Sequence, residues 1–149
     1  MDENLQDIGE SVAEKLDESV LGWDIANGEL TIRVRRDDII KVIKFLRDDP
    51  TCHFSCFVDI CGVDYPEREN RFEVVYHLLS LHQNLRVRVK IATDPSTPVP
   101  SIVELFPGAD WFEREAFDMY GILFADHPDL RRILTDYGFD GHPLRKDFP

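Results

Sequence analysis

The sequence lacks any apolar run of the ~18 residues that a membrane-spanning helix needs. Its first 20 residues are acidic and hold no central apolar stretch, which predicts neither a secretory signal nor an organelle transit peptide. Basic residues are also scarce: 17 Lys and Arg stand against 29 Asp and Glu, and half of the net charge of −12 lies in residues 1–22. Nucleic-acid binding requires a basic face, so this function class is disfavoured.

Motifs of familiar active sites are absent as well. The sequence has no Gly-x-Ser-x-Gly elbow, no Walker loop and no dinucleotide-binding fingerprint. With 149 residues, 43% hydrophobic and 31% charged, it has the length and composition of one ordinary globular domain. These features indicate a folded chain without an active site of its own.

Only three cysteines occur, an odd number that, without a secretion signal, indicates reduced thiols. Cys52, Cys56 and Cys61 would lie along one extended stretch, the outer two roughly 30 Å apart, with Cys61 facing away from Cys56. Metal ligands must converge on one centre, so buried, inert thiols are expected. A stand-alone metal-dependent enzyme using Cys52, His53, His77 and nearby acids is the alternative that this geometry disfavours.

The five histidines show no paired metal-ligand spacing. His77 and His82 stand at the end of one predicted strand and the start of the next, where they can approach each other, but a third ligand is not apparent. His127 and His142 each precede proline, which favours extended or turn conformations. The sequence therefore predicts no metal site.

The order of the predicted elements is typical of an α+β fold. An acidic amphipathic helix over residues 5–20 precedes a hairpin around Asn27-Gly28, a strong hairpin signal. A second helix ends before Pro50, and its inward face is predicted to consist of Ile39, Ile40, Ile43 and Leu46. A short helix is expected at residues 101–105.

Three further strands are predicted. Residues 54–63 are nearly apolar on both faces, which favours a central, covered strand. Residues 72–81 and 85–91 are joined by a short turn and form an antiparallel pair, with Arg86, Arg88 and Lys90 pointing outward. That cation row is either a docking face for an acidic partner or a solvated sheet face. We expect an antiparallel or mixed sheet with the helices packed on one face.

Residues 109–121 predict an amphipathic helix. Asp110 is expected at its N-cap with Glu113 in the capping-box position, and Gly121 is expected to end it. Three residues recur every four positions, which supports ion pairs on a solvated face: Asp110, Arg114 and Asp118. Glu113 and Glu115 point about 200° apart on a helix, so they cannot share one acid–base site.

Residues 122–149 have no periodicity but are too apolar for a disordered tail. They predict a long irregular C-terminal arm after an α+β domain at residues 1–121. An ordered arm needs a surface to lie on, either its own domain or another protein, and we expect another protein.

Two stretches carry a resemblance to a known family. They are Glu-Arg-Glu-Ala-Phe-Asp-Met-Tyr-Gly-Ile at residues 113–122 and the tail, with His-Pro-Asp-Leu-Arg-Arg at 127–132 and Gly-His-Pro-Leu-Arg-Lys-Asp-Phe-Pro at 141–149. They closely resemble the signature of the thirty-kilodalton subunit family of the respiratory NADH:quinone oxidoreductase, complex I. Members of that family continue past the Asp-Phe-Pro motif, where this sequence ends.

The resemblance implies a peripheral-arm subunit of this proton-translocating complex that packs on the large, hydrogenase-like quinone-site subunit. It implies no cofactor in this chain, with FMN, iron–sulfur clusters, NADH and quinone bound by other subunits. It implies a place on the cytoplasmic side of a bacterial inner membrane, or on the matrix side for a processed mitochondrial chain. The alternative is the equivalent subunit of a related ferredoxin-fed or hydrogenase-type complex.

The resemblance also implies residues that contact a partner or anchor the arm. They are Glu113, Arg114, Glu115, Asp118, Tyr120, Gly121, Arg131, Arg132, His142, Pro143, Leu144, Arg145, Lys146 and Asp147.

Overall fold

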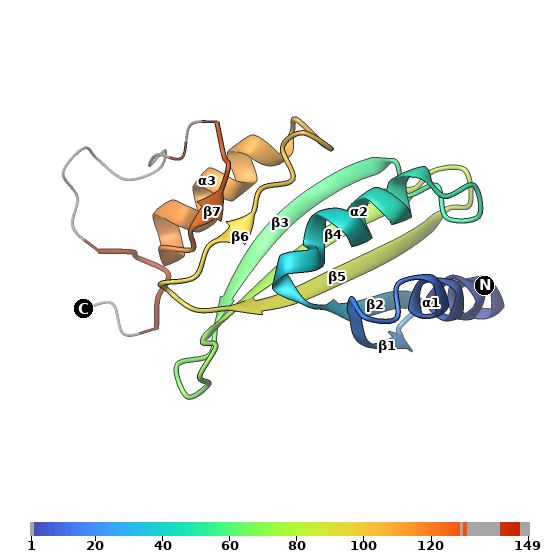
Figure 1. Ribbon diagram of the computed structural model, residues 1–149, viewed down its shortest axis with the longest axis horizontal. Helices are drawn as coiled ribbons and strands as arrows, with labels where there is room; N and C mark the ends of the chain where they lie inside the picture. Colours follow the sequence, from blue (N-terminus) through green and yellow to red (C-terminus); the bar gives the residue numbers. More distant parts are fainter. Residues whose placement is uncertain (1, 129, 131–140, 147–149) are drawn as a thin grey trace.

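The structure is a computed structural model that describes residues 2–128, 130 and 141–146. A sheet of five strands is covered by α1 and α2, while α3 packs along β3 beside a second sheet of two short strands (Figure 1). In chain order the elements are α1 (Asp2–Lys15), β1 (Val20–Ala26), β2 (Glu29–Val34), the 3-10 helix η1 (Arg36–Asp38), α2 (Ile39–Asp48), β3 (Cys56–Asp64), β4 (Phe72–Ser80), β5 (Leu85–Thr93), β6 (Val99–Pro100), α3 (Ala109–Tyr120) and β7 (Phe124–Ala125). Among the described residues, no helix is both long and apolar enough to cross a membrane.

The larger sheet is mixed, in the order β1-β2-β5-β4-β3. Only β2 and β5 pair in parallel, and the other neighbours in this sheet are antiparallel. Asn27 and Gly28 both have positive φ, 54° and 74°, as a type I′ hairpin turn requires. The predicted α+β fold with helices on one face of a mixed sheet is confirmed.

Three details of the helices differ from the sequence prediction. The first helix ends at Lys15, because Val20 begins β1. In α2 the buried positions are 39, 42, 43 and 46, so Val42 faces the core and Ile40 is 40% exposed. Residues 101–105 form turns instead of a helix.

The prediction of a central position for β3 is wrong. This strand lies at the edge of the sheet, and β5, whose side chains alternate strictly between the two faces, lies at the centre. Ile60 of β3 is buried in the core, whereas Val58 is 37% exposed. An apolar sequence on both faces therefore did not signify burial on both faces, because an edge strand can keep apolar side chains on its open side.

A β-bulge in β3 changes which cysteines share a face. Phe57 pairs with Leu78 and Asp59 with His77, so the register shifts by one residue between them. A bulge reverses the alternation beyond it. The prediction that Cys56 and Cys61 face opposite sides is therefore wrong: their cross-strand partners lie on the same outer side of β4.

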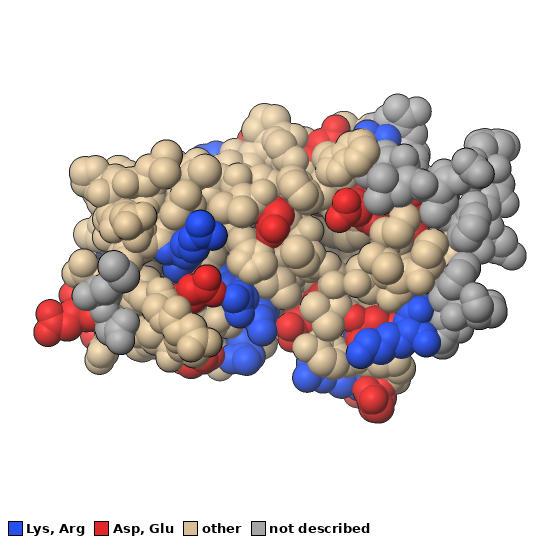
Figure 2. Space-filling view, turned by 180° about the vertical axis from the view of Figure 1, so that it is seen from behind, with Lys and Arg blue, Asp and Glu red and all other residues tan. Residues whose placement is uncertain are grey.

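The outer face of the sheet carries charges that are largely paired. Arg88 lies 2.6 Å from Glu29, and Lys90 lies 3.5 Å from Glu73. Figure 2 shows the molecule from behind, with acidic and basic side chains interspersed among other residues. This arrangement favours a solvated, charge-balanced sheet face over a basic docking face for the predicted cation row.

We predict that Tyr76→Phe stabilises the protein. The Tyr76 side chain is completely buried, and its hydroxyl has no hydrogen-bond partner among the described residues. Removing an unsatisfied buried hydroxyl should raise the free energy of unfolding by about 1 kcal/mol. Thermal and denaturant unfolding measure this change, with Tyr76→Ala as the contrasting variant that leaves a cavity and should lose about 3–5 kcal/mol. A loss of stability in Tyr76→Phe would show that the hydroxyl is satisfied.

Candidate interface site

Glu113, in the N-terminal half of α3, does not take the capping-box role that the sequence predicts. The N-cap is Gly108, and no side chain caps this helix end. Glu113 turns inward and is completely buried. It accepts hydrogen bonds from the Ser101 hydroxyl (2.6 Å) and from the Ile102 backbone N–H (2.9 Å). The carboxyl group thus fastens the segment after β6 to α3.

Burial has a large electrostatic effect on this carboxyl group. Desolvation raises the pKa of Glu113 from 4.5 to about 7, while the hydrogen bonds from Ser101 and Ile102 work in the opposite direction. The charge of Asp110 adds to the rise. The imidazole of His127 is also buried here, with Nε2 3.0 Å from Asp110 and 3.8 Å from Glu113.

The prediction of a solvated, ion-paired face on α3 is also wrong. Asp118, like Glu113, has no exposed surface. Arg114 and Glu115 are half-buried, and Trp111 is 46% exposed. The spacing of four residues was real, but it did not reveal that β7 and the C-terminal segment cover part of this helix.

Residues 141–146, which we name the clasp, bind the C-terminal end of α3. His142 donates from Nδ1 to the carbonyl oxygen of Asp118 (2.8 Å), and the Leu144 N–H donates to that of Met119 (2.9 Å). Arg145 donates from Nε to the carbonyl oxygen of Tyr120 (2.5 Å). The last carbonyls of a helix have no partners within it, and cationic side chains are favoured at this end. The clasp meets both requirements.

Gly121 makes this arrangement possible. It ends α3 in the left-handed conformation with φ of 80°, as predicted. A Cβ atom at this position would collide with the Arg145 guanidinium and lie 2.8 Å from the His142 ring. Both the backbone conformation and the close approach of the clasp therefore require glycine.

A buried ion pair, which the sequence analysis did not identify, joins the clasp to the sheet. Arg71 donates to both carboxylate oxygens of Asp64, from Nε at 2.8 Å and from Nη2 at 2.6 Å. The Lys146 N–H donates to the same carboxylate (2.8 Å). The hydrogen bond from Arg71, followed by that from Lys146, lowers the pKa of Asp64 below its usual range. The available signal in the sequence was an Asp at the end of a mainly apolar strand.

Residues 141–146 thus have a surface to lie on within their own chain, so a partner is not needed to place them. Within the clasp, Pro143 is half-buried, Leu144 is 52% exposed and Lys146 is exposed. Docking of the arm on a partner stays a prediction. Three of the predicted interface residues lie outside the described residues: Arg131, Arg132 and Asp147.

The cysteines and histidines only partly follow the sequence prediction. Cys52 is buried, and desolvation raises the pKa of its thiol to about 11, as expected for an inert thiol. Cys61, in contrast, is exposed. The two histidines that could approach each other, His77 and His82, have different neighbours. The His82 ring lies against that of His53, with ring centroids 5.6 Å apart, and Nδ1 of His77 lies 2.6 Å from Oδ1 of Asp59.

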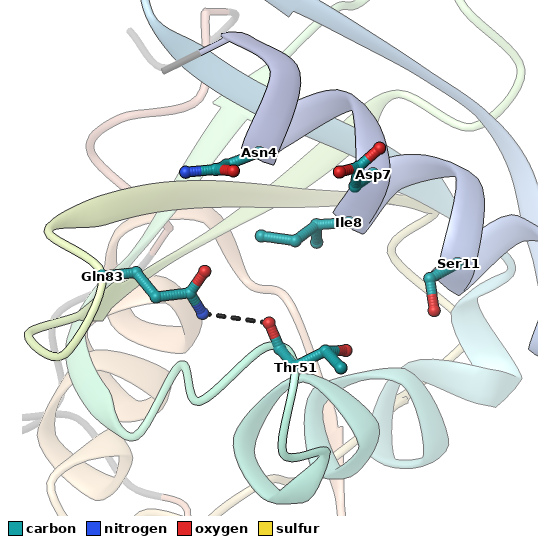
Figure 3. Close-up of a pocket in the computed structure, with 6 residues that line it drawn as sticks. All are labelled: Asn4, Asp7, Ile8, Ser11, Thr51 and Gln83. Atoms are coloured by element: carbon teal, nitrogen blue, oxygen red, sulfur yellow. Dashed lines mark hydrogen bonds between the residues drawn. The ribbon is translucent and has the colours of Figure 1, made fainter.

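A pocket of about 360 Å³ lies elsewhere, between α1 and the turn after α2 (Figure 3). Asn4, Asp7 and Ser11 of α1 face Thr51 and Gln83 across it, with Ile8 between them. Gln83 donates to the backbone carbonyl of Thr51 (3.0 Å). None of the predicted interface residues that the structure describes lines this pocket.

The fold and the clasp define an α+β domain that is closed by its own C-terminal segment. Residues 32–149 match the family "Respiratory-chain NADH dehydrogenase, 30 Kd subunit". The whole chain is 65% identical to the subunit designated C of the NADH-quinone oxidoreductase of Maricaulis maris, covering 74% of that protein. It is 66% identical to the same subunit of Xanthobacter autotrophicus, covering 71% of it.

A solved structure shares the fold as well. A chain of the membrane-bound sulfane sulfur reductase, an archaeal respiratory membrane complex, superposes with a TM-score of 0.81 at 25% identity. The match covers 97% of this chain and 85% of the other. The higher identities to the bacterial subunits decide between the two kinds of complex. The chain belongs to the 30 kDa subunit family of NADH-quinone oxidoreductase, which is complex I.

We predict that Gly121→Ala destabilises the protein more than Gly28→Ala does. Both glycines have positive φ, so each substitution should cost about 1–2 kcal/mol through backbone strain. A Cβ atom at Gly28 meets nothing within 4 Å, whereas at Gly121 it also displaces the clasp. Thermal unfolding and tryptic cleavage after Arg145 measure the difference. Equal losses of stability with unchanged cleavage would show that the clasp does not depend on Gly121.

We also predict that Glu113 makes the stability depend on pH. Its pKa in the folded state, about 7, lies above the ordinary 4.5, so between these values the folded protein holds a proton that the unfolded chain has released. Stability should therefore fall as the pH rises through this range, by ~3 kcal/mol at most. Glu113→Gln should remove this decline.

The matched control is Glu115→Gln, which changes a half-buried carboxylate on the same helix. Unfolding measured from pH 5 to 8 should show a flatter profile for Glu113→Gln than for Glu115→Gln. Identical pH profiles would mean that Glu113 is ionised in the folded state.

Proposed function

We propose that the chain is a non-catalytic subunit of the peripheral arm of complex I, which packs on the large quinone-site subunit and stabilises it. The main support for this proposal is that residues of the family signature make contacts within the chain itself. Glu113, Gly121 and Arg145 form an internal anchor, in which their polar groups bind other parts of the same chain. An anchor of this kind shapes a surface and leaves no room for a substrate.

The redox cofactors belong, in this proposal, to other subunits. FMN, iron–sulfur clusters, NADH and quinone are bound elsewhere in the complex, and electrons do not pass through this chain. The complex would hold the chain on the cytoplasmic side of a bacterial inner membrane, or on the matrix side of a mitochondrial one.

The contact surface is formed by the exposed side chains of α3 and the clasp. Trp111 and Leu144 are large apolar residues with 46% and 52% exposure. Arg114 and Glu115 are half-buried, and Lys146 is exposed. Aromatic and arginine side chains contribute strongly at protein interfaces, and charge pairs that lose water there matter far more than exposed ones.

Comigration tests the proposal. The chain is tagged in its native cell, membranes are solubilised gently, and a native gel is stained for NADH oxidation. We expect the tag in a very large NADH-oxidising band that contains flavin and iron. A large band without NADH oxidation would favour the related hydrogenase-type complex, and a small species alone would contradict the subunit role.

Charge reversal then tests the surface. We predict that Arg114→Glu lowers the amount of assembled complex about tenfold, which corresponds to ~1.4 kcal/mol of binding free energy. The melting temperature of the purified chain should stay the same, because Arg114 is not part of the anchor. Lys41→Glu, which reverses an exposed charge on α2, is the control and should assemble normally. Normal assembly of Arg114→Glu would remove this residue from the interface.

A further inference from the structure

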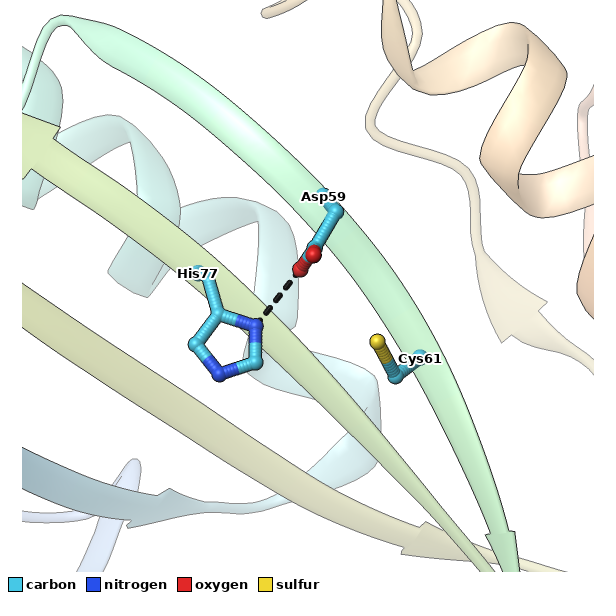
Figure 4. Close-up of side chains that lie close together, drawn as sticks. All are labelled: Asp59, Cys61 and His77. Atoms are coloured by element: carbon cyan, nitrogen blue, oxygen red, sulfur yellow. Dashed lines mark hydrogen bonds and ion pairs between the residues drawn. The ribbon is translucent and has the colours of Figure 1, made fainter.

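Three potential metal ligands converge on the outer face of the sheet, at its β3 edge. Asp59 and Cys61 are two residues apart on β3, and His77 stands opposite Asp59 on β4. Figure 4 shows the three side chains on the same side of the two strands. One ligand atom from each lies within 4.8 Å of the other two. The bulge places them here, because it sets the register that follows Phe57.

The distances are close to those of a coordination sphere. Bonds of about 2.0–2.3 Å to a tetrahedral zinc ion place two ligand atoms about 3.3–3.8 Å apart. Asp59 and His77 are closer than this at 2.6 Å, and the largest separation in the group is not above 4.8 Å. Side-chain rotations of ~1 Å therefore suffice to bring the three atoms around one ion, without a change of the backbone.

The site is open to solvent, and both acidic and basic side chains lie near it. The side chains of His77 and Asp59 are 32% and 34% exposed, and Cys61 is exposed. The charges of Asp59 and Glu115 raise the pKa of the Cys61 thiol, after the larger effect of desolvation. On the neighbouring strand β5, Arg88 stands opposite His77, and Lys90 follows two residues later. Both cations are already paired, Arg88 with Glu29 at 2.6 Å and Lys90 with Glu73 at 3.5 Å. A divalent cation would replace the thiol proton, because a thiol binds metal as the thiolate.

We propose that Asp59, Cys61 and His77 form a binding site for a zinc-type divalent cation, with water in the fourth position. A thiolate, an imidazole and a carboxylate together match zinc, whereas magnesium and calcium require sites made of oxygen ligands. On binding, the thiol proton is released to solvent and the imidazole proton moves from Nδ1 to Nε2 of His77, so that the Asp59–His77 hydrogen bond is replaced by two bonds to the ion.

A nucleophilic Cys–His–Asp arrangement is the competing interpretation of the same residues. It requires a thiol whose pKa is lowered by its neighbours. Here partial desolvation, followed by the neighbouring acids, raises the pKa of Cys61. The cluster is therefore unsuited to covalent catalysis.

Cobalt(II) is the probe for the experiment, because a thiolate bound to it gives a charge-transfer absorption in the near ultraviolet. The purified full chain, freed of metal by a chelator that is then removed, is titrated with cobalt and afterwards with zinc. We expect one equivalent of cobalt to bind with this absorption, and zinc to displace it. No thiolate absorption at one equivalent would overturn the proposal.

Variants assign the ligands. Cys61→Ser should lose the charge-transfer band, and His77→Asn should weaken cobalt binding tenfold or more. Cys56→Ser is the matched control, since Cys56 lies on the same strand and face, and it should bind as the wild type does. Circular dichroism and melting of the metal-free variants verify that they are folded. A band that persists in Cys61→Ser, or is lost in Cys56→Ser, would contradict the assignment.

This site is independent of the proposed function. One part of the sequence argument against a metal was that Cys56 and Cys61 face opposite sides, and the register of β3 removes that part. Comigration with the complex and the cobalt spectrum are separate measurements, so either can fail without the other.

Discussion

The carbonyl groups at the C-terminal end of α3 need hydrogen-bond donors, and the chain supplies them by turning back on itself. Gly121 reverses the direction of the backbone, and residues 142–145 then donate to the carbonyls of residues 118–120. Lys146 extends this contact to Asp64 at the end of β3. Since one short segment completes a helix and meets a strand, the placement of residues 141–146 depends on a few directed hydrogen bonds.

Two buried carboxyl groups hold the remaining parts of this region, and they do so in different electrostatic states. Asp64 stays ionised because Arg71 donates two hydrogen bonds to it. Glu113 has no such cation in hydrogen-bonding contact among the described residues, and desolvation raises its pKa to about 7. Each group accepts a hydrogen bond from a backbone N–H, Asp64 from Lys146 and Glu113 from the buried Ile102. The cost of burying them is thereby offset by backbone order.

Features of the fold that depend on local chemistry could be predicted from the sequence. The hairpin at Asn27-Gly28 and the helix end at Gly121 follow from conformations that few residues adopt. Features that depend on residues distant in the chain could not be predicted. The edge position of β3, and the burial of Glu113 and Asp118, are decided by segments far away in the chain. The bulge in β3 shifts the register by a single residue, a change that the apolar pattern of this strand did not indicate.

The internal anchors also bear on how the chain can meet a partner. Leu144 lies between His142 and Arg145, both bound to α3, and its own N–H donates to the Met119 carbonyl. Its side chain is nevertheless 52% exposed. An exposed apolar residue on a segment that is already ordered loses little conformational entropy when a partner covers it. In the proposed contact surface, the hydrogen bonds that close the domain would therefore also hold Leu144 in place for a partner.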